Sequence, residues 1–176
     1  MVQIIFEAHG TTFDNEAKRA SGHFDVDLSP LGEKQAEELG ERRGDDNFDA
    51  IFCSDLKRSF HTAEIAFDGK TPIFRDDRLR ECDYGDMTLK SSDIVEKEKG
   101  QRISKPFPGG ESYEQTTERM KEFLTSLKRH YTGKKVLVIG HRATQYALEN
   151  LINKVPLEKA VTAPWSWQPG WEYKLS

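Results

Sequence analysis

Two histidines and one arginine each stand just beyond a short apolar run. His9 follows the run 4–6, His141 follows the run 136–139, and Arg58 comes shortly after a third run. An imidazole can attack as a nucleophile or carry a proton near neutral pH, and a guanidinium binds anions. A phosphomonoester carries close to two negative charges and needs cationic or helix N-terminal donors. Brought together, these side chains outline a phosphoryl-transfer site.

The elements that would bring them together follow from the apolar pattern. Strands are predicted over residues 3–8, 49–53 and 135–140, with a short edge strand at 71–75 and a terminal strand at 171–175. Four helices are predicted between them. The first begins at the N-cap Ser29 and Pro30 and ends at about Arg43, and the second is capped by Ser54 or Asp55 and ends at Phe67. The third runs from the capping box of Ser112 and Gln115 to Tyr131, and the fourth runs from His141-Arg142 to Ile152.

This alternation predicts one α/β domain over residues 1–176. We expect a three-layer sandwich, a mostly parallel central sheet with helices on both faces. In such sheets ligands bind beyond the carboxyl ends of the strands, where His9, Arg58 and His141 would meet.

Composition excludes several classes of protein. The chain has 176 residues and a formal net charge of −4, which argues against a dedicated nucleic-acid binder because such proteins need a basic footprint. Its longest purely apolar runs are far shorter than the roughly 18 residues of a membrane span. The N-terminus lacks the pattern of a secretory signal, so we expect a cytoplasmic protein. The oligomeric state stays open.

Several other residues receive structural rather than chemical interpretations. Cys53 and Cys82 are too few for a disulfide framework and are predicted to be buried thiols. The polar stretch 83–104 is predicted to be an excursion or small lid, with 93–102 as a solvated face. Surface or boundary positions are expected for His23, His61 and His130, and a packing role for Trp165, Trp167 and Trp171.

Nearly the whole chain resembles the histidine phosphatase (phosphoglycerate mutase-like) superfamily. The motifs that carry the resemblance occur in order: Ala8-His9-Gly10-Thr11-Thr12-Phe13-Asp14-Asn15, Gly22, Leu28-Ser29-Pro30-Leu31-Gly32 with Gln35-Ala36, Ser54-Asp55-Leu56-Lys57-Arg58 with Thr62-Ala63, Leu79-Arg80-Glu81 with Gly85, Pro108-Gly109-Gly110-Glu111-Ser112, and Val138-Ile139-Gly140-His141. Each motif alone is weak, but the ordered set is specific. The fold implied is phosphoglycerate mutase-like.

The resemblance also implies a role for each matched residue. His9 would be the nucleophile that becomes phosphohistidine, Glu81 the proton donor, and His141 an imidazolium that stabilises developing charge. The residues implied to bind the phosphoryl group are Gly10, Asn15, Gly22 and Arg58. No metal or cofactor is implied, and the partner would be a small phosphorylated substrate or inorganic phosphate. Glu81 also has a structural alternative, an ion pair with Arg80.

One position departs from the pattern. Ala8 stands where the superfamily has an arginine that grips the phosphoryl group, and losing such a donor typically costs about 10²–10³ in rate. The residue after the second histidine, usually glycine, is Arg142, so we expect Arg142 to reach back and supply the missing charge. The alternative is that Arg142 faces solvent or pairs with an acid.

Three functions are compatible with these residues. The leading hypothesis is a phosphatase that hydrolyses a small phosphomonoester through phosphohistidine. A phosphoglycerate mutase-type phosphotransferase is the first alternative, although 176 residues leave little room for the extra segments that exclude water. A non-catalytic member that binds phosphate or another anion is the second, because Ala8 replaces the motif arginine.

Overall fold

A five-stranded sheet organises the chain, all of whose residues 1–176 are described by the computed structural model. The strand order is β3-β2-β4-β1-β5, and every pairing is parallel except that of β5 with β1. The strands are β1 (Val2–Ala8), β2 (Ala50–Cys53), β3 (Ile73–Arg75), β4 (Lys135–Gly140) and β5 (Trp171–Leu175). The predicted α/β class and the mostly parallel sheet are confirmed.

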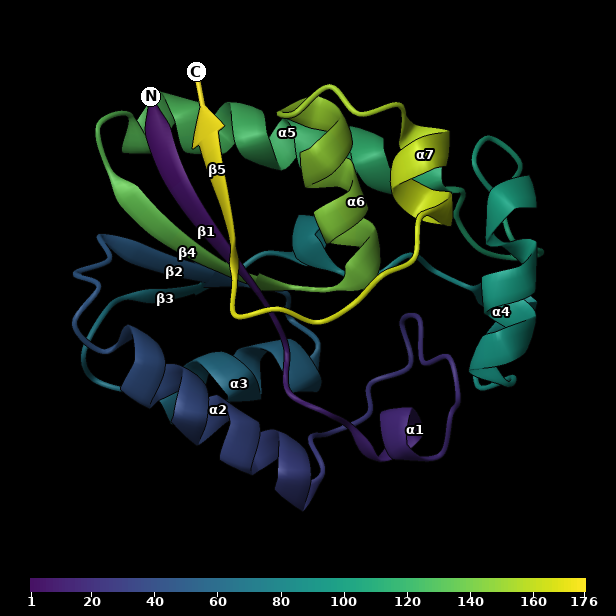
Figure 1. The fold of residues 1–176 in the computed structure, drawn as a ribbon, viewed down its shortest axis with the longest axis horizontal. Coiled ribbons are helices and arrows are strands. Elements are labelled where there is room, and N and C mark those ends of the chain that lie inside the picture. Colours follow the sequence, from purple (N-terminus) through teal and green to yellow (C-terminus); the bar gives the residue numbers. More distant parts are fainter.

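Helices cover both faces of the sheet (Figure 1). Helices α2 and α3 lie on one face and α5 and α6 on the other, while α1 and α4 lie beyond the carboxyl ends of the parallel strands. The helices are α1 (Phe13–Glu16), α2 (Pro30–Arg43), α3 (Lys57–Phe67), α4 (Ser92–Glu98), α5 (Tyr113–Tyr131), α6 (Arg142–Leu151) and α7 (Leu157–Thr162). None of them has the length and apolar character needed to cross a bilayer.

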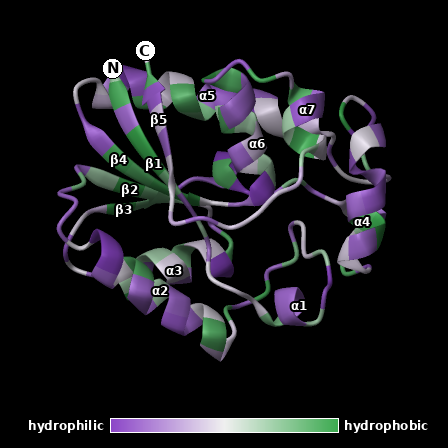
Figure 2. Ribbon diagram, in the orientation of Figure 1, coloured by the Kyte–Doolittle hydropathy of each residue, from purple (hydrophilic) through white to green (hydrophobic).

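Strand β1 is buried on both faces. Its alternate residues point to opposite sides of the sheet, so Ile4 and Phe6 pack with Met120 on the α5 side, whereas Ile5 packs with Leu39 on the α2 side. Figure 2 shows that the central strands β1 and β4 are mostly hydrophobic, whereas the edge strand β5 is mostly hydrophilic. This double burial fixes the strand end that carries His9.

The predicted start of α2 is confirmed, and that of α3 is wrong. The Ser29 side chain accepts a hydrogen bond from the Gly32 N–H, as the capping pattern requires. Helix α3 instead begins after Leu56, which provides no side-chain cap. Ser54 and Asp55 are occupied elsewhere, because the Ser54 hydroxyl contacts His141 and the Asp55 carboxylate pairs with Arg80. The capping box predicted for α5 is present.

The stretch 83–104 lies outside the sheet as predicted, but it is not simply a solvated face. Val95 packs into a third apolar cluster with Tyr84. The stems of Lys99 and Arg102 are also buried, because their charged ends pair with glutamates of the same segment. The excursion is therefore fastened to the body of the protein at its base.

Most of the structural predictions for the cysteines, the other histidines and the tryptophans are confirmed, and one is wrong. Both cysteines are buried, and the histidines outside the site lie at the surface or at its boundary. Trp165 and Trp171 stack on each other as packing residues. Trp167 is 59% exposed, so the packing prediction is wrong for this residue. Its segment crosses in front of the sheet edge on the way to β5 (Figure 1).

A close approach of two backbones holds the loop after β1 against the start of α2. A Cβ atom added to Gly32 would lie 1.9 Å from the Thr11 carbonyl oxygen, and one added to Gly10 would lie 2.5 Å from the Gly32 carbonyl oxygen. The Thr11 N–H also donates to the Gln35 side chain at 2.8 Å. The loop that follows His9 therefore tolerates no side chain at either glycine.

Replacing Gly32 by Ala is expected to lower the free energy of unfolding by about 1–3 kcal/mol, because the new methyl group overpacks a backbone contact. The loss should occur even though alanine is the better helix former. Gly100→Ala is the control, since a Cβ there would meet only the Thr162 methyl group at 3.5 Å. Equal denaturant midpoints for the two variants would contradict the overpacking argument.

Candidate active site

His9 stands at the carboxyl end of β1 in a fixed tautomer. Its Nδ1 lies 2.7 Å from the Gly10 carbonyl oxygen. A carbonyl only accepts hydrogen bonds, so Nδ1 carries the proton and Nε2 keeps its lone pair. Burial, followed by the positive charge of Arg58, lowers the pKa of His9 to about 3. The ring is therefore neutral at pH 7, the state that a nucleophile requires.

His141 lies beside His9 at the end of β4. The two ring centroids are 5.0 Å apart, and the His141 Nε2 atom lies 2.8 Å from the Ser54 hydroxyl oxygen. Burial holds the pKa of His141 well below its ordinary value, with further lowering by the charge of Arg58. The ring is therefore neutral at pH 7, whereas the resemblance implied an imidazolium. A bound dianion would favour the protonated form.

Arg58 supplies a buried positive charge without a carboxylate partner. Its side chain is 3% exposed, and its terminal nitrogens donate to the Phe24 carbonyl at 3.0 Å and the Gly22 carbonyl at 2.6 Å. It forms none of the protein's ion pairs, and burial lowers the pKa of its guanidinium. An uncompensated buried charge is costly, and a phosphate in the cavity would neutralise it.

Glu81 presents one free carboxylate oxygen. Its Oε1 atom accepts from the backbone N–H groups of Cys82 at 2.8 Å and Ala143 at 3.2 Å. Its Oε2 atom has no hydrogen-bond partner, and the residue is nearly buried. The alternative ion pair with Arg80 is wrong, because Arg80 pairs with Asp55. Oε2 is thus available to carry a proton.

The three remaining candidates for binding the phosphoryl group, Asn15, Gly10 and Gly22, make different contacts. Asn15 lines the cavity, and its Oδ1 atom accepts from the Thr12 N–H, so its NH₂ group is left to donate. The Gly10 N–H already donates to the Thr62 hydroxyl. Gly22 adopts a left-handed backbone conformation, with φ +52°, and its carbonyl supports Arg58. The Gly10 N–H is therefore occupied within the protein, whereas Gly22 supports the Arg58 guanidinium through its carbonyl.

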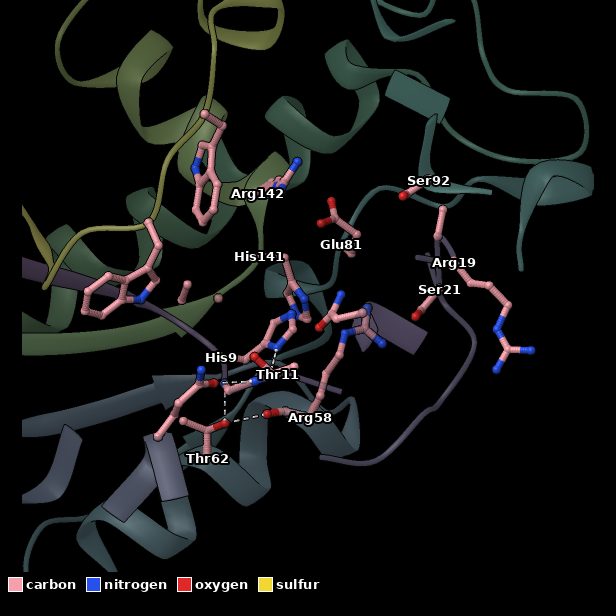
Figure 3. A pocket seen from close by; sticks show the side chains of 18 of the residues that line it. His9, Thr11, Arg19, Ser21, Arg58, Thr62, Glu81, Ser92, His141 and Arg142 are labelled. Atoms are coloured by element: carbon pink, nitrogen blue, oxygen red, sulfur yellow. Dashed lines mark hydrogen bonds between the residues drawn. The ribbon is translucent and has the colours of Figure 1, made fainter. Parts of the chain in front are cut away.

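Arg142 and Ala8 line the same cavity. The Arg142 guanidinium lies 4.5 Å from the ring centroid of Trp165 and 3.8 Å from an oxygen of Glu96. It is half-exposed and long enough to move. In this position it pairs weakly with an acid, as the alternative interpretation expected, while it remains at the edge of the histidine site (Figure 3).

The cavity has a volume of about 730 Å³ and opens at the sheet edge. His9, Arg58 and His141 lie close together in this cavity, and Glu81 lies beside them toward Arg142 (Figure 3). One wall comes from α2 and the segment 163–170, and the opposite wall from α4 and the loop after α1. All of the predicted catalytic and binding residues line this one cavity.

The geometry can be compared with known proteins. A family model described as "Histidine phosphatase superfamily (branch 1)" matches residues 4–166. The chain belongs to the histidine phosphatase superfamily. The match includes every candidate site residue and most of the structural elements.

Relatives of this superfamily member include proteins named as phosphatases. "Uncharacterized phosphatase PhoE" of Bacillus subtilis (strain 168) is 34% identical over 84% of this chain and 76% of its own length. "Phosphoserine phosphatase 1" of Hydrogenobacter thermophilus is 32% identical over 90% of this chain and 80% of its own. The solved structure of Bacillus stearothermophilus YhfR superposes with a TM-score of 0.85 at 26% identity, covering 96% of this chain and 88% of that one.

Three supporting residues of this histidine phosphatase site were not predicted individually. Ser54 contacts His141, and Thr62 links the Gly10 N–H to the Arg58 carbonyl. Both stand in matched motifs, which was the available signal. Arg42 lines the cavity from the last turn of α2 and pairs with the buried Glu7. No motif marks that pair, because it depends on the packing of α2 against β1.

The neutral state of His9 predicts a pH-dependent stability. Between pH 6.5 and about 3 the unfolded chain binds a proton at this position that the folded protein does not. The free energy of unfolding should therefore fall as the pH falls through this window. Thermal unfolding of His9→Asn is expected to lose less stability between pH 7 and pH 5 than the native protein. His130→Asn, at an exposed position on α5, is the control and should follow the native curve. Parallel curves for native and His9→Asn would contradict a neutral His9.

Proposed function

We propose that this member of the superfamily is a cytoplasmic phosphatase that hydrolyses a small phosphomonoester through a phosphohistidine at His9. The observation that carries the proposal is a neutral His9, with its Nε2 lone pair free, beside the unpaired charge of Arg58. Relatives named as phosphatases support the same reaction class.

In the first step, the His9 Nε2 lone pair attacks phosphorus. The bond from phosphorus to the ester oxygen breaks, and Glu81 in its carboxylic acid form donates its proton to that oxygen, so the alcohol leaves neutral. In the second step, the Glu81 carboxylate takes a proton from water while the water oxygen attacks phosphorus. The phosphorus–nitrogen bond breaks, which releases inorganic phosphate and restores neutral His9.

The other residues stabilise the transferring group. Two backbone carbonyls accept hydrogen bonds from the Arg58 guanidinium and hold it in place. Its remaining N–H groups would donate to the phosphoryl oxygens. His141 and the Asn15 amide supply further donors, and the approach of the dianion favours protonation of His141. Fixed donors in a partly dry site stabilise developing charge without reorganisation.

Hydrolysis is favoured over mutase-type transfer by the access of water to the site. His9 is only partly buried, and its cavity is much larger than one phosphate group. A mutase must keep water away from phosphohistidine until the acceptor binds. The water access of this large cavity therefore supports the phosphatase reaction.

Phosphate release from a panel of phosphomonoesters tests the nucleophile. His9→Asn is expected to lower turnover by at least about 10³-fold, because covalent catalysis is lost. The native protein should form an acid-labile phosphoenzyme, and His9→Asn should not. His130→Asn should retain native turnover. A variant without His9 that still releases phosphate at the native rate would overturn the mechanism.

The Arg142 hypothesis has its own test. If Arg142 supplies the charge that Ala8 lacks, Arg142→Ala should reduce kcat/KM by about tenfold or more, with partial rescue in Arg142→Lys. Unchanged phosphate affinity and turnover in Arg142→Ala would contradict this role. An inert native protein that gains activity on Ala8→Arg would instead identify a non-catalytic anion binder.

A further inference from the structure

The cavity continues well past the residues that would hold a phosphoryl group. Along the α2 side it is lined by Gln35, Glu38 and Arg42, and beyond them by Trp167. Ligand cavities typically have volumes of about 300–1,000 Å³, so this one accommodates a larger leaving group as well as phosphate. The exposed indole of Trp167 is the main apolar surface in this part of the wall.

The segment that carries Trp167 is anchored on both sides of this residue. On its carboxyl side, Arg43 donates to the Pro169 carbonyl at 3.0 Å. Arg43 is in turn fixed by the buried carboxylate of Glu7 at 2.9 Å. On its amino side, Trp165 stacks on Trp171. An anchored segment lowers the ordering cost of placing the indole against a planar group.

Polar groups with free hydrogen-bonding capacity line the same wall of the cavity along α2. Glu38 is exposed and forms no ion pair, so its carboxylate can accept N–H donors. The Gln35 Oε1 atom is occupied by the Thr11 N–H, which leaves its NH₂ group to donate. The Arg42 guanidinium lies 5.8 Å from the Trp167 ring centroid and can cover one edge of a stacked ring.

The opposite wall offers no comparable surface. It is lined mostly by charged side chains, including Lys18, Arg19, Asp93 and Glu96, and its larger apolar residues, Tyr84 and Val95, are buried and expose little surface. Trp165 is also engaged, because Arg142 and Trp171 lie against its ring. A planar group in the cavity would therefore lie against Trp167.

We propose that the surface formed by Gln35, Glu38, Arg42 and Trp167 is a subsite for a nucleobase, and that the substrate class is nucleoside monophosphates. The inference rests on the proposed phosphatase function for its phosphate end. A nucleobase has a flat face that can stack on an indole. Its edge carries N–H groups and ring nitrogens that can form hydrogen bonds with Glu38 and Gln35. Ordinary sugar phosphates lack both.

The test compares adenosine 5′-monophosphate with ribose 5-phosphate, which has the same phosphate and sugar but no base. The native protein is expected to show a kcat/KM at least about tenfold higher for the nucleotide, since stacking on an aromatic side chain contributes roughly 5- to 150-fold. Trp167→Ala should remove this preference while leaving ribose 5-phosphate turnover unchanged. Trp167→Phe should restore part of it. Phe74→Ala, an exposed aromatic on β3 outside the cavity, is the matched control.

Binding separates failure of the subsite from failure of the reaction. Dissociation constants of both compounds are measured by calorimetry on His9→Ala and on the double variant His9→Ala, Trp167→Ala, in which the proposed nucleophile is absent. Tighter nucleotide binding that depends on Trp167 supports the subsite, even if the native protein releases no phosphate and the phosphatase proposal fails. Equal affinities for the two compounds, or an equal loss for both in the double variant, would overturn the nucleobase subsite.

Discussion

The arrangement of the site depends on one buried charge that has no ion-pair partner. Arg58 is buried and is supported by two backbone carbonyls, and no carboxylate forms an ion pair with it. Its field lowers the pKa of both nearby imidazoles, after the larger effect of burial, and so keeps His9 and His141 neutral. The same charge favours the binding of an anion in the cavity. One guanidinium thereby helps to keep both imidazoles neutral and attracts anions to them.

Keeping this charge buried requires backbone support from distant parts of the chain. Gly22 presents its carbonyl to Arg58 from a left-handed conformation. The contact between Gly10 and Gly32 fixes the loop after β1, and Thr62 ties that loop to α3. These contacts involve main-chain atoms almost throughout. The geometry is consequently set by the path of the backbone, and few side-chain substitutions could reproduce it.

The sequence predicted the sheet, its helices and the main chemical residues, because these leave strong local patterns. Apolar runs marked the strands, and the ordered motifs brought His9, Arg58, Glu81 and His141 to one edge. Tertiary pairing was not visible in the same way. Ser54 matched a capping pattern but contacts His141, and Trp167 matched a packing pattern but is exposed. The positions of such side chains depend on contacts with residues that are distant in the sequence. Local sequence patterns do not reveal these contacts.

The position of β1 in the sheet has a consequence for the order of folding. Strand β1 is the first strand in the chain, yet both of its neighbours, β4 and β5, come from residues 135–175. Contacts of such high sequence separation form slowly, and during synthesis both edges of β1 stay unpaired until the last strands are made. A nascent chain therefore holds His9 at the end of a strand whose two edges are still unpaired. The site comes into existence only when the sheet closes, so its geometry is a late product of folding.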